Sequence, residues 1–208
     1  MSKSYFAPET YQITEIEIKK SRFIAEAFPI SSADEAKQMI DQVKLREPTA
    51  SHHCSGFISG SPLDSGKAGA YGFSDDGEPT GTAGKPIYNA IKGANMGGVC
   101  IVVTRYFGGT KLGTGGLIRA YGDSARAVLE QITPIEIIPT TVMKLSFPYS
   151  ATAFVDSVVH NKELALFDQQ FAESVDYWLR VPKEQTLPIK HLFEEGGKGD
   201  LLVKVIED

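Results

Sequence analysis

The spacing of apolar and polar residues predicts two strands and a helix at the start of the chain. Residues 12–18 (QITEIEI) alternate with a period of two, which is typical of a strand with one buried face. Residues 22–30 predict a second strand. Ser32 and Glu35 then form a capping-box pair ahead of apolar residues at helical spacing, and Pro48 lies beyond the end of that helix.

The middle of the chain predicts a buried strand between two helices. Residues 53–59 favour a third strand, a long polar loop covers 60–82, and a short helix follows at about 84–93. The run 99–107 (VCIVVTRYF) is β-branched and aromatic, as in a buried strand. After GGTKLGTGG, apolar residues at helical spacing predict a long helix from about Thr114 to Gln131.

Beyond Pro134 the pattern becomes that of a second, smaller domain. Its predicted order is β-α-β-β-α-β, which is the ferredoxin-like arrangement. We place the boundary at Ile132-Thr133-Pro134 and expect an α+β protein with two domains, 1–132 and 133–208. The expected strands are 139–147, 164–172, 175–181 and 201–206, and the expected helices are about 151–161 and 186–195.

Composition narrows the classes of protein to which this chain can belong. The chain of 208 residues is 42% apolar and 23% charged, which is typical of a globular protein. It has no apolar run long enough to cross a membrane and no secretory signal, and it has only two cysteines, so we expect a cytoplasmic protein. The net charge of −5 lies entirely in 133–208, because 1–132 is balanced. A general polycation is therefore disfavoured, whereas a local basic patch on the first domain is not.

Glycines are concentrated between Gly56 and Gly122, which hold 17 of the 20. Neither standard nucleotide loop is present: Pro79 and Pro86 break the P-loop pattern, and Ile118 replaces the last glycine of the dinucleotide fingerprint. The glycine-rich start of the long helix still offers free N–H groups to an anion. The alternative is a tight turn that requires small residues. The candidate anion-contacting residues are Lys85, Arg105, Gly108, Gly109, Lys111, Gly113, Gly115, Gly116 and Arg119.

Three carboxylates, Asp75, Asp76 and Glu78, cluster in the polar loop. Such a cluster can hold a magnesium ion or supply a general acid and base, although the same residues also form ordinary water-facing turns. His52-His53-Cys54 has too few partner ligands for zinc; structural histidines are the favoured interpretation, and a Cys-His nucleophile pair is the alternative. We therefore expect no bound metal and no cofactor.

The polar face of the long helix carries alternating charges. Arg119, Asp123, Arg126 and Glu130 follow one another at spacings that allow them to pair. A self-paired, solvated face is the ordinary interpretation of this pattern, and a contact of Arg119 or Arg126 with a partner is the alternative.

Long motifs between His52 and Tyr121 resemble one family. HHC, then GFSDDGEPTGTAGKP, then VVTRYFGGTKLGTGGLIRAYGD is similar to the IMPACT family in its bacterial, YigZ-like branch. The resemblance covers almost the whole chain. It implies that the first domain has the fold of the second domain of small-subunit ribosomal protein S-five, shared with domain IV of elongation factor G. It also implies a ferredoxin-like second domain and a link to translational control, because eukaryotic members act there.

Two functional hypotheses follow. The first is a non-enzymatic module that binds RNA, the ribosome or a translation-linked protein through the cations named above, with Tyr106 and Phe107 available for stacking on bases. Core packing is the alternative role for Phe107. The second is an enzyme or binding protein for a phosphorylated small molecule that uses His52, Asp75, Asp76 and Glu78. The sequence leaves the oligomeric state open.

Overall fold

Contacts in the structure divide the chain into two compact units. The structure is a computed structural model that describes residues 4–62, 70–197 and 199–206. One unit covers Ser4–Ile137 and the other begins at Ile138, so the division falls a few residues beyond the boundary placed at Ile132. Both units mix helices with antiparallel sheets, which agrees with the expected α+β class.

The first unit is built on a five-stranded antiparallel sheet. Its strand order is β2-β3-β6-β4-β5, with β6 at the centre. The strands are β2 (Gln12–Ile18), β3 (Ser21–Pro29), β4 (His52–Ile58), β5 (Tyr71–Ser74) and β6 (Val99–Tyr106).

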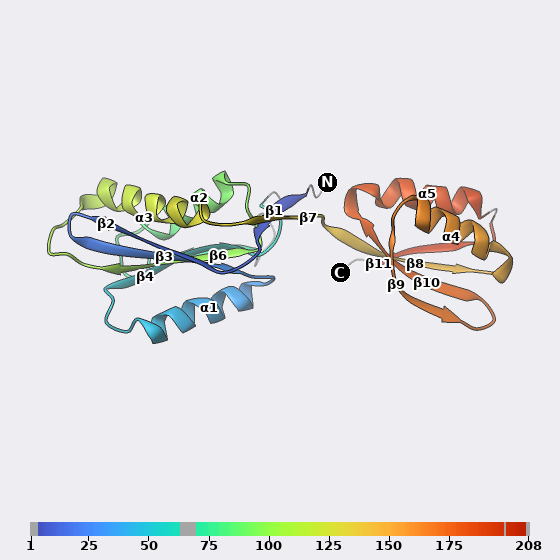
Figure 1. Cartoon of the computed structure of the whole chain (residues 1–208), viewed down its shortest axis with the longest axis horizontal. Helices are drawn as coiled ribbons and strands as arrows, with labels where there is room; N and C mark the ends of the chain where they lie inside the picture. Colours follow the sequence, from blue (N-terminus) through green and yellow to red (C-terminus); the bar gives the residue numbers. More distant parts are fainter. Residues whose placement is uncertain (1–3, 63–69, 198, 207–208) are drawn as a thin grey trace. The chain divides into compact units, whose positions relative to one another are not determined.

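Helices cover both faces of this sheet (Figure 1). Helices α2 (Gly84–Gly93) and α3 (Gly113–Leu129) lie on one face, and α1 (Ala33–Arg46) lies on the other. Every second residue of β6 therefore packs under α2 and α3, and the alternate residues, Cys100 and Val102, pack under α1. This arrangement explains why β6 is apolar at nearly every position.

The start of α1 confirms the expected capping pattern. Ser32 accepts a hydrogen bond from the backbone N–H of Glu35 at 3.2 Å. The Glu35 carboxylate in turn accepts one from the backbone N–H of Ser31 at 2.6 Å. The first bond satisfies a donor that a helix start would otherwise leave unpaired, and the second fixes the residue before the N-cap.

Three short strands were not expected from the sequence. Strand β5 lies inside the loop assigned to 60–82, of which residues 63–69 fall outside the described residues. Strand β1 (Tyr5–Pro8) pairs antiparallel with β7 (Pro134–Ile137), so the last residues of the first unit are tied to its first ones. Four residues are too few for periodicity to be visible, and proline borders both β1 and β7.

The second unit has the predicted order β-α-β-β-α-β. Its antiparallel sheet has the strand order β11-β8-β10-β9. Both helices pack on the same face of this sheet, where Met143, Leu145, Tyr177 and Phe193 form the core (Figure 1). The elements are β8 (Thr140–Phe147), α4 (Thr152–Asn161), β9 (Ala165–Phe171), β10 (Val175–Pro182), α5 (Thr186–Gly196) and β11 (Leu202–Ile206).

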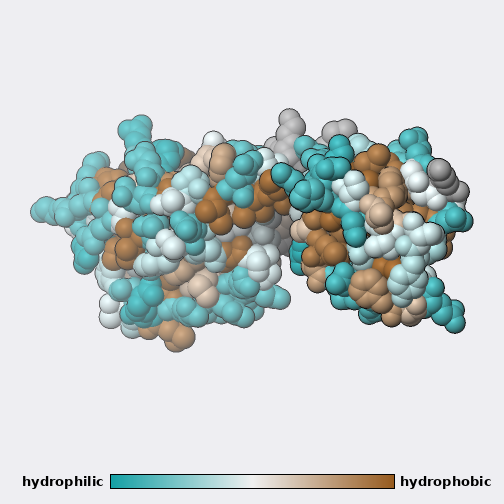
Figure 2. Space-filling view, turned by 45° about the vertical axis from the view of Figure 1, so that its right-hand side comes forward, coloured by the Kyte–Doolittle hydropathy of each residue, from teal (hydrophilic) through white to brown (hydrophobic). Residues whose placement is uncertain are grey.

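The surface of the protein is mixed in polarity. On the face seen in Figure 2, hydrophobic patches interrupt a surface that is largely hydrophilic. Among the residues that the structure describes, no helix combines the length and the hydropathy that crossing a bilayer requires.

Pairing of β1 with β7 predicts how shortened chains behave. A chain that ends at Ile137 should unfold cooperatively, because the first unit has its own core. A chain that ends at Ile132 lacks β7 and should melt about 5 °C lower, since a loss of about 1 kcal/mol shifts the melting temperature of a small domain by that order. Calorimetry on both chains tests this, and equal melting temperatures would contradict it.

Cysteine burial predicts slow thiol chemistry. Both Cys54 and Cys100 are free and buried. Burial raises the pKa of each thiol to about 12, so almost no thiolate is present near neutral pH. Ellman's reagent should therefore react with neither cysteine in the native protein and with both in guanidinium. A disulfide between them in the intact mass of the native protein would contradict this expectation.

Candidate functional site

The first carboxylate of the acidic cluster caps helix α2. Asp75 follows β5, and its side chain accepts hydrogen bonds from the backbone N–H groups of Gly81, Ala83 and Gly84 at 2.7, 3.0 and 2.9 Å. Burial alone would raise the pKa of Asp75, but these three donors hold it below its usual value. Glycine is required at position 84, because a Cβ there would lie 2.6 Å from the carbonyl oxygen of Ser74.

The second carboxylate ties helix α1 to strand β4. Asp76 accepts a hydrogen bond from Lys44 Nζ at 2.6 Å and one from the backbone N–H of His53 at 2.7 Å. Burial would raise the pKa of Asp76, and these two donors lower it below its usual value. Asp75 and Asp76 therefore serve contacts within the fold.

The third carboxylate is buried beside an arginine. Glu78 accepts a hydrogen bond from Arg105 Nη1 at 2.5 Å and one from the Tyr121 hydroxyl at 2.8 Å. Glu78 is 8% exposed and Arg105 only 5%, so this ion pair is shielded from water. Burial is also the main cause of the raised pKa of Tyr121, which therefore stays protonated and donates to Glu78.

One histidine borders this buried pair. His52 Nε2 lies 3.9 Å from a carboxylate oxygen of Glu78. His52 Nδ1 lies 2.8 Å from the backbone carbonyl of Asp76, which can only accept, so Nδ1 carries a proton. His52 and Glu78 are thus brought together as the enzyme hypothesis requires, but all three carboxylates are already hydrogen-bonded. Within the described part of the chain, no group of three His, Cys, Asp or Glu residues is arranged to hold a metal ion.

Two residues that the sequence suggested as RNA contacts, Arg105 and Tyr106, do not reach the α2–α3 surface. Arg105 is buried, with its guanidinium 5.4 Å from the ring centre of Phe23 and 5.5 Å from that of Phe107, so it cannot reach a phosphate. Tyr106 points to the opposite face of the sheet, where its hydroxyl donates to Glu47 at 2.5 Å. Alternation along β6 sends neighbours to opposite faces, so Tyr106 cannot act together with the α3 residues. Phe107 is half exposed.

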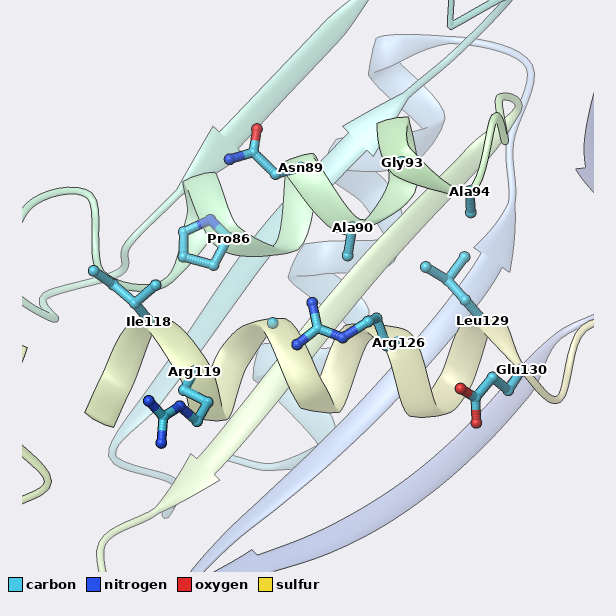
Figure 3. Close-up of a pocket in the computed structure, with 11 residues that line it drawn as sticks. Pro86, Asn89, Ala90, Gly93, Ala94, Ile118, Arg119, Arg126, Leu129 and Glu130 are labelled. Atoms are coloured by element: carbon cyan, nitrogen blue, oxygen red, sulfur yellow. The ribbon is translucent and has the colours of Figure 1, made fainter. Parts of the chain in front are cut away.

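A groove runs between helices α2 and α3 (Figure 3). Pro86 lies near Ile118 at one end and Ala94 near Leu129 at the other, so the two helices run in the same direction. Small side chains leave a volume of about 700 Å³ open to solvent. The remaining lining residues are Asn89, Ala90, Gly93, Arg119, Gly122, Arg126 and Glu130.

Positive charge surrounds the end of the groove where both helices begin. Lys85, Lys111 and Arg119 are exposed, and none of them has a carboxylate within ion-pair distance in the ranges that the structure describes. Arg126 is paired with Asp123 on the same helix. The sequence left open whether the charged side chains of this helix face form ion pairs with one another. Among the described residues, Arg126 forms such a pair and Arg119 does not.

The glycines at the start of α3 keep its backbone accessible. Gly113 has a φ of +73°, which favours glycine, and Leu112 before it provides no side-chain cap. Gly115 is exposed and Gly116 partly so. Gly109 also has a positive φ, and a Cβ on Gly108 would lie 2.0 Å from the backbone of Lys20, so those two glycines serve the turn itself.

Sequence reasoning missed the groove and the buried hydrogen bonds of Glu78. The groove depends on Ala90, Gly93 and Gly122, which are small residues at helical positions. Gly122 in the middle of α3 was the available signal, because glycine inside a helix is unfavourable without a packing reason. No signal in the sequence connects Glu78 with Tyr121.

These features define a two-unit α+β protein with a cation-bordered groove on one helical face. A family model described as the Impact N-terminal domain matches residues 19–129. The chain belongs to the IMPACT family.

Relatives align with this chain over nearly its full length. An IMPACT family member of Haemophilus influenzae is 34% identical over 98% of this chain and 97% of its own. YigZ of Escherichia coli is 33% identical over 92% of this chain and 93% of its own, and YvyE of Bacillus subtilis is 35% identical over 97% and 91%. A crystal structure described as that of a hypothetical protein is 31% identical, covers all of both chains and superposes with a TM-score of 0.71.

The cap provided by Asp75 predicts a pH-dependent loss of stability. Asp75→Asn should destabilise the protein by about 2 kcal/mol at neutral pH, because hydrogen bonds to a charged acceptor are worth more than those to a neutral one. The pKa of Asp75 is lowered in the folded state, so its contribution is complete above the unfolded value of about 3.9 and is lost as the pH falls through the folded value. The difference in the free energy of unfolding between wild type and variant should therefore become smaller as the pH is lowered.

Urea denaturation at several pH values measures this difference. Asp41→Asn is the control, because Asp41 is exposed on α1 and its side chain makes no hydrogen bond among the described residues. A difference for Asp75→Asn that stays constant from neutral pH to about pH 3 would contradict the capping role.

Proposed function

We propose that this protein is a non-enzymatic module that binds RNA phosphates on the α2–α3 face of its first unit. The observation that carries the proposal is the set of exposed cations Lys85, Lys111 and Arg119 beside the open groove, for which the described part of the chain offers no carboxylate within ion-pair distance. RNA affinity depends chiefly on cations that neutralise phosphates, and exposed cations that are not held in an ion pair are the side chains that serve this purpose.

Helix direction supports the same face. Because α2 and α3 run in the same direction, the positive ends of both helix dipoles lie at the end of the groove where the unpaired cations gather. Asp75 already satisfies the start of α2, whereas Leu112, the N-cap residue of α3, provides no side-chain cap. Its free N–H groups add to the attraction that Lys111 and Arg119 exert on a phosphate.

The wider context supports RNA as the partner. We infer that the first unit has the fold of the second domain of ribosomal protein S-five and of domain IV of elongation factor G, and that the second unit is ferredoxin-like. Both folds occur in parts of the translation machinery that touch RNA, which is support by analogy. A cytoplasmic role in the regulation of translation, exerted on RNA, on the ribosome or on a translation-linked protein, follows from this assignment.

The alternative is an enzyme or binding protein for a phosphorylated small molecule. The observation in its favour is the proximity of His52 to Glu78. The existing hydrogen bonds of Asp75, Asp76 and Glu78 make this alternative the weaker one, because an acid that already holds the fold together is not free for chemistry. If the alternative were right, added magnesium would raise the melting temperature by binding the native state.

Salt-dependent binding tests the proposal. Lys111→Ala and Arg119→Ala should each weaken binding of a labelled RNA hairpin by up to about 1 kcal/mol, which is roughly fivefold. Each should also reduce the slope of log affinity against log salt by about 0.7 to 0.9, since one phosphate contact is lost. Fluorescence anisotropy at several salt concentrations measures both quantities.

Two matched variants serve as controls. Lys37→Ala removes an exposed cation of α1, on the opposite face of the sheet, and should change nothing. Glu130→Gln removes a negative charge from the groove and should strengthen binding. Affinity that is independent of salt, or equal losses for Lys37→Ala and Lys111→Ala, would exclude the α2–α3 face as an RNA-binding site.

A further inference from the structure

The second unit leaves one face of its four-stranded sheet uncovered. Helices α4 and α5 pack on the other face (Figure 1). Alternation along β8 and β10 separates a buried set, which includes Leu145 and Tyr177, from a set that reaches solvent. The open face carries Val142, Lys144 and Ser146 from β8, Asp176, Trp178 and Arg180 from β10, and Leu202, Lys204 and Ile206 from β11.

Two aromatic rings lie on or beside this open face, each with a cation over it. Trp178 is half-buried on the central strand β10, and Lys144 Nζ lies 4.7 Å from its ring centre. The register of β9 shifts opposite Trp178 and Leu179. Phe167 lies at this shift, is 49% exposed, and has the Arg180 guanidinium 5.2 Å from its ring centre.

The open face carries more positive than negative side chains, whereas the second unit as a whole is negatively charged. Residues 133–208 contain seven lysines and arginines and twelve acidic residues. Three of those cations lie on this face, at Lys144, Arg180 and Lys204, whereas Asp168 and Asp176 are the acids that the register places there. Asp176 is paired with Lys144 at 2.8 Å, so Arg180 and Lys204 are the cations that a ligand would meet.

We propose that this open face binds single-stranded nucleic acid by stacking unpaired bases on Trp178 and Phe167. Every base has a flat π-face, so aromatic side chains on a sheet accept bases of any sequence. Arg180 lies over Phe167, and Lys204 lies on the same face two strands away from Trp178, so both can neutralise phosphates of a strand that crosses the face. The combination of rings and cations favours a strand of nucleic acid over an apolar protein surface, which would leave those cations without partners.

This site is independent of the one proposed on the first unit. It lies on a different unit and uses stacking, whereas the α2–α3 face uses phosphate contacts alone. Binding of single strands therefore does not require Lys111 or Arg119, and either site can fail without the other.

The fluorescence of Trp178 reports on stacking directly. Trp178 is the one tryptophan of the chain, so its emission can be excited selectively in the full-length protein. An oligouridylate or oligothymidylate of about 12 nucleotides should quench this emission. The same length of duplex, whose bases are already stacked, should quench it far less.

Variants test the contribution of each ring to affinity. Trp178→Ala should weaken binding of a labelled single strand by about 5- to 150-fold, because stacking on one aromatic ring is worth about 1–3 kcal/mol. Trp178→Phe keeps a ring and should retain most of the affinity, and Arg180→Ala should weaken binding while leaving the tryptophan signal in place. Phe171→Ala is the matched control: Phe171 is an exposed aromatic of β9 whose ring contacts Tyr177 on the helix-covered side.

The outcomes distinguish the two sites. Lys111→Ala with Arg119→Ala should weaken hairpin binding and leave quenching by single strands unchanged. An absence of quenching, or equal affinity in wild type, Trp178→Ala and Arg180→Ala, would overturn the stacking site whatever happens at the first site. A change from dimer to monomer in Trp178→Ala, without any binding of single strands, would also overturn it and would assign the face to contact between two copies of the chain. Circular dichroism confirms that each variant is folded.

Discussion

Burial of one positive charge organises the end of the first sheet. Arg105 lies at the end of the central strand β6, on the face that α3 covers. A guanidinium that has lost its water requires a counter-ion and hydrogen-bond acceptors, otherwise its burial costs several kcal/mol. Glu78 provides the counter-ion, and this requirement brings the loop after β5 across the end of the sheet. Once the loop is there, Asp75 reaches the first N–H groups of α2, and Asp76 reaches Lys44 on α1.

This constraint assigns different roles to two sets of charged residues. The loop that carries Asp75, Asp76 and Glu78 positions α1, α2 and α3 around the sheet. Its carboxylates therefore serve contacts within the first unit. Within the described ranges, Lys85, Lys111 and Arg119 have no carboxylate within ion-pair distance, and they remain available at the surface. A resemblance in sequence does not separate these roles, because both sets lie within the same long motifs. Hydrogen-bond partners and exposure do separate them.

The sequence predicted the elements that have a clear periodicity and missed those that depend on tertiary contacts. The strand 12–18, the helix capped by Ser32 and the β-α-β-β-α-β order of the second unit were all confirmed, since local spacing and capping determine them. Strand β5 was missed because four residues with a glycine carry no readable pattern. Arg105 was mistaken for a phosphate contact because β6 is buried on both faces, so its apolar run gave no sign of which side chains point inward. The groove was missed because it depends on how two helices pack, and Gly122 inside α3 was its signal in the sequence.

The ribbon formed by β1 and β7 has a consequence for synthesis of the chain. Tyr5–Pro8 leaves the ribosome first, and its partner Pro134–Ile137 leaves last among the elements of the first unit. At about 5–20 residues per second, about 6 to 25 seconds separate the two. During that time the N-terminal strand has an open edge, which is the kind of surface that chaperones and neighbouring nascent chains recognise. Completion of the first unit is therefore coupled to the emergence of the residues that lead into the second, and the early strand is closed only when β7 arrives.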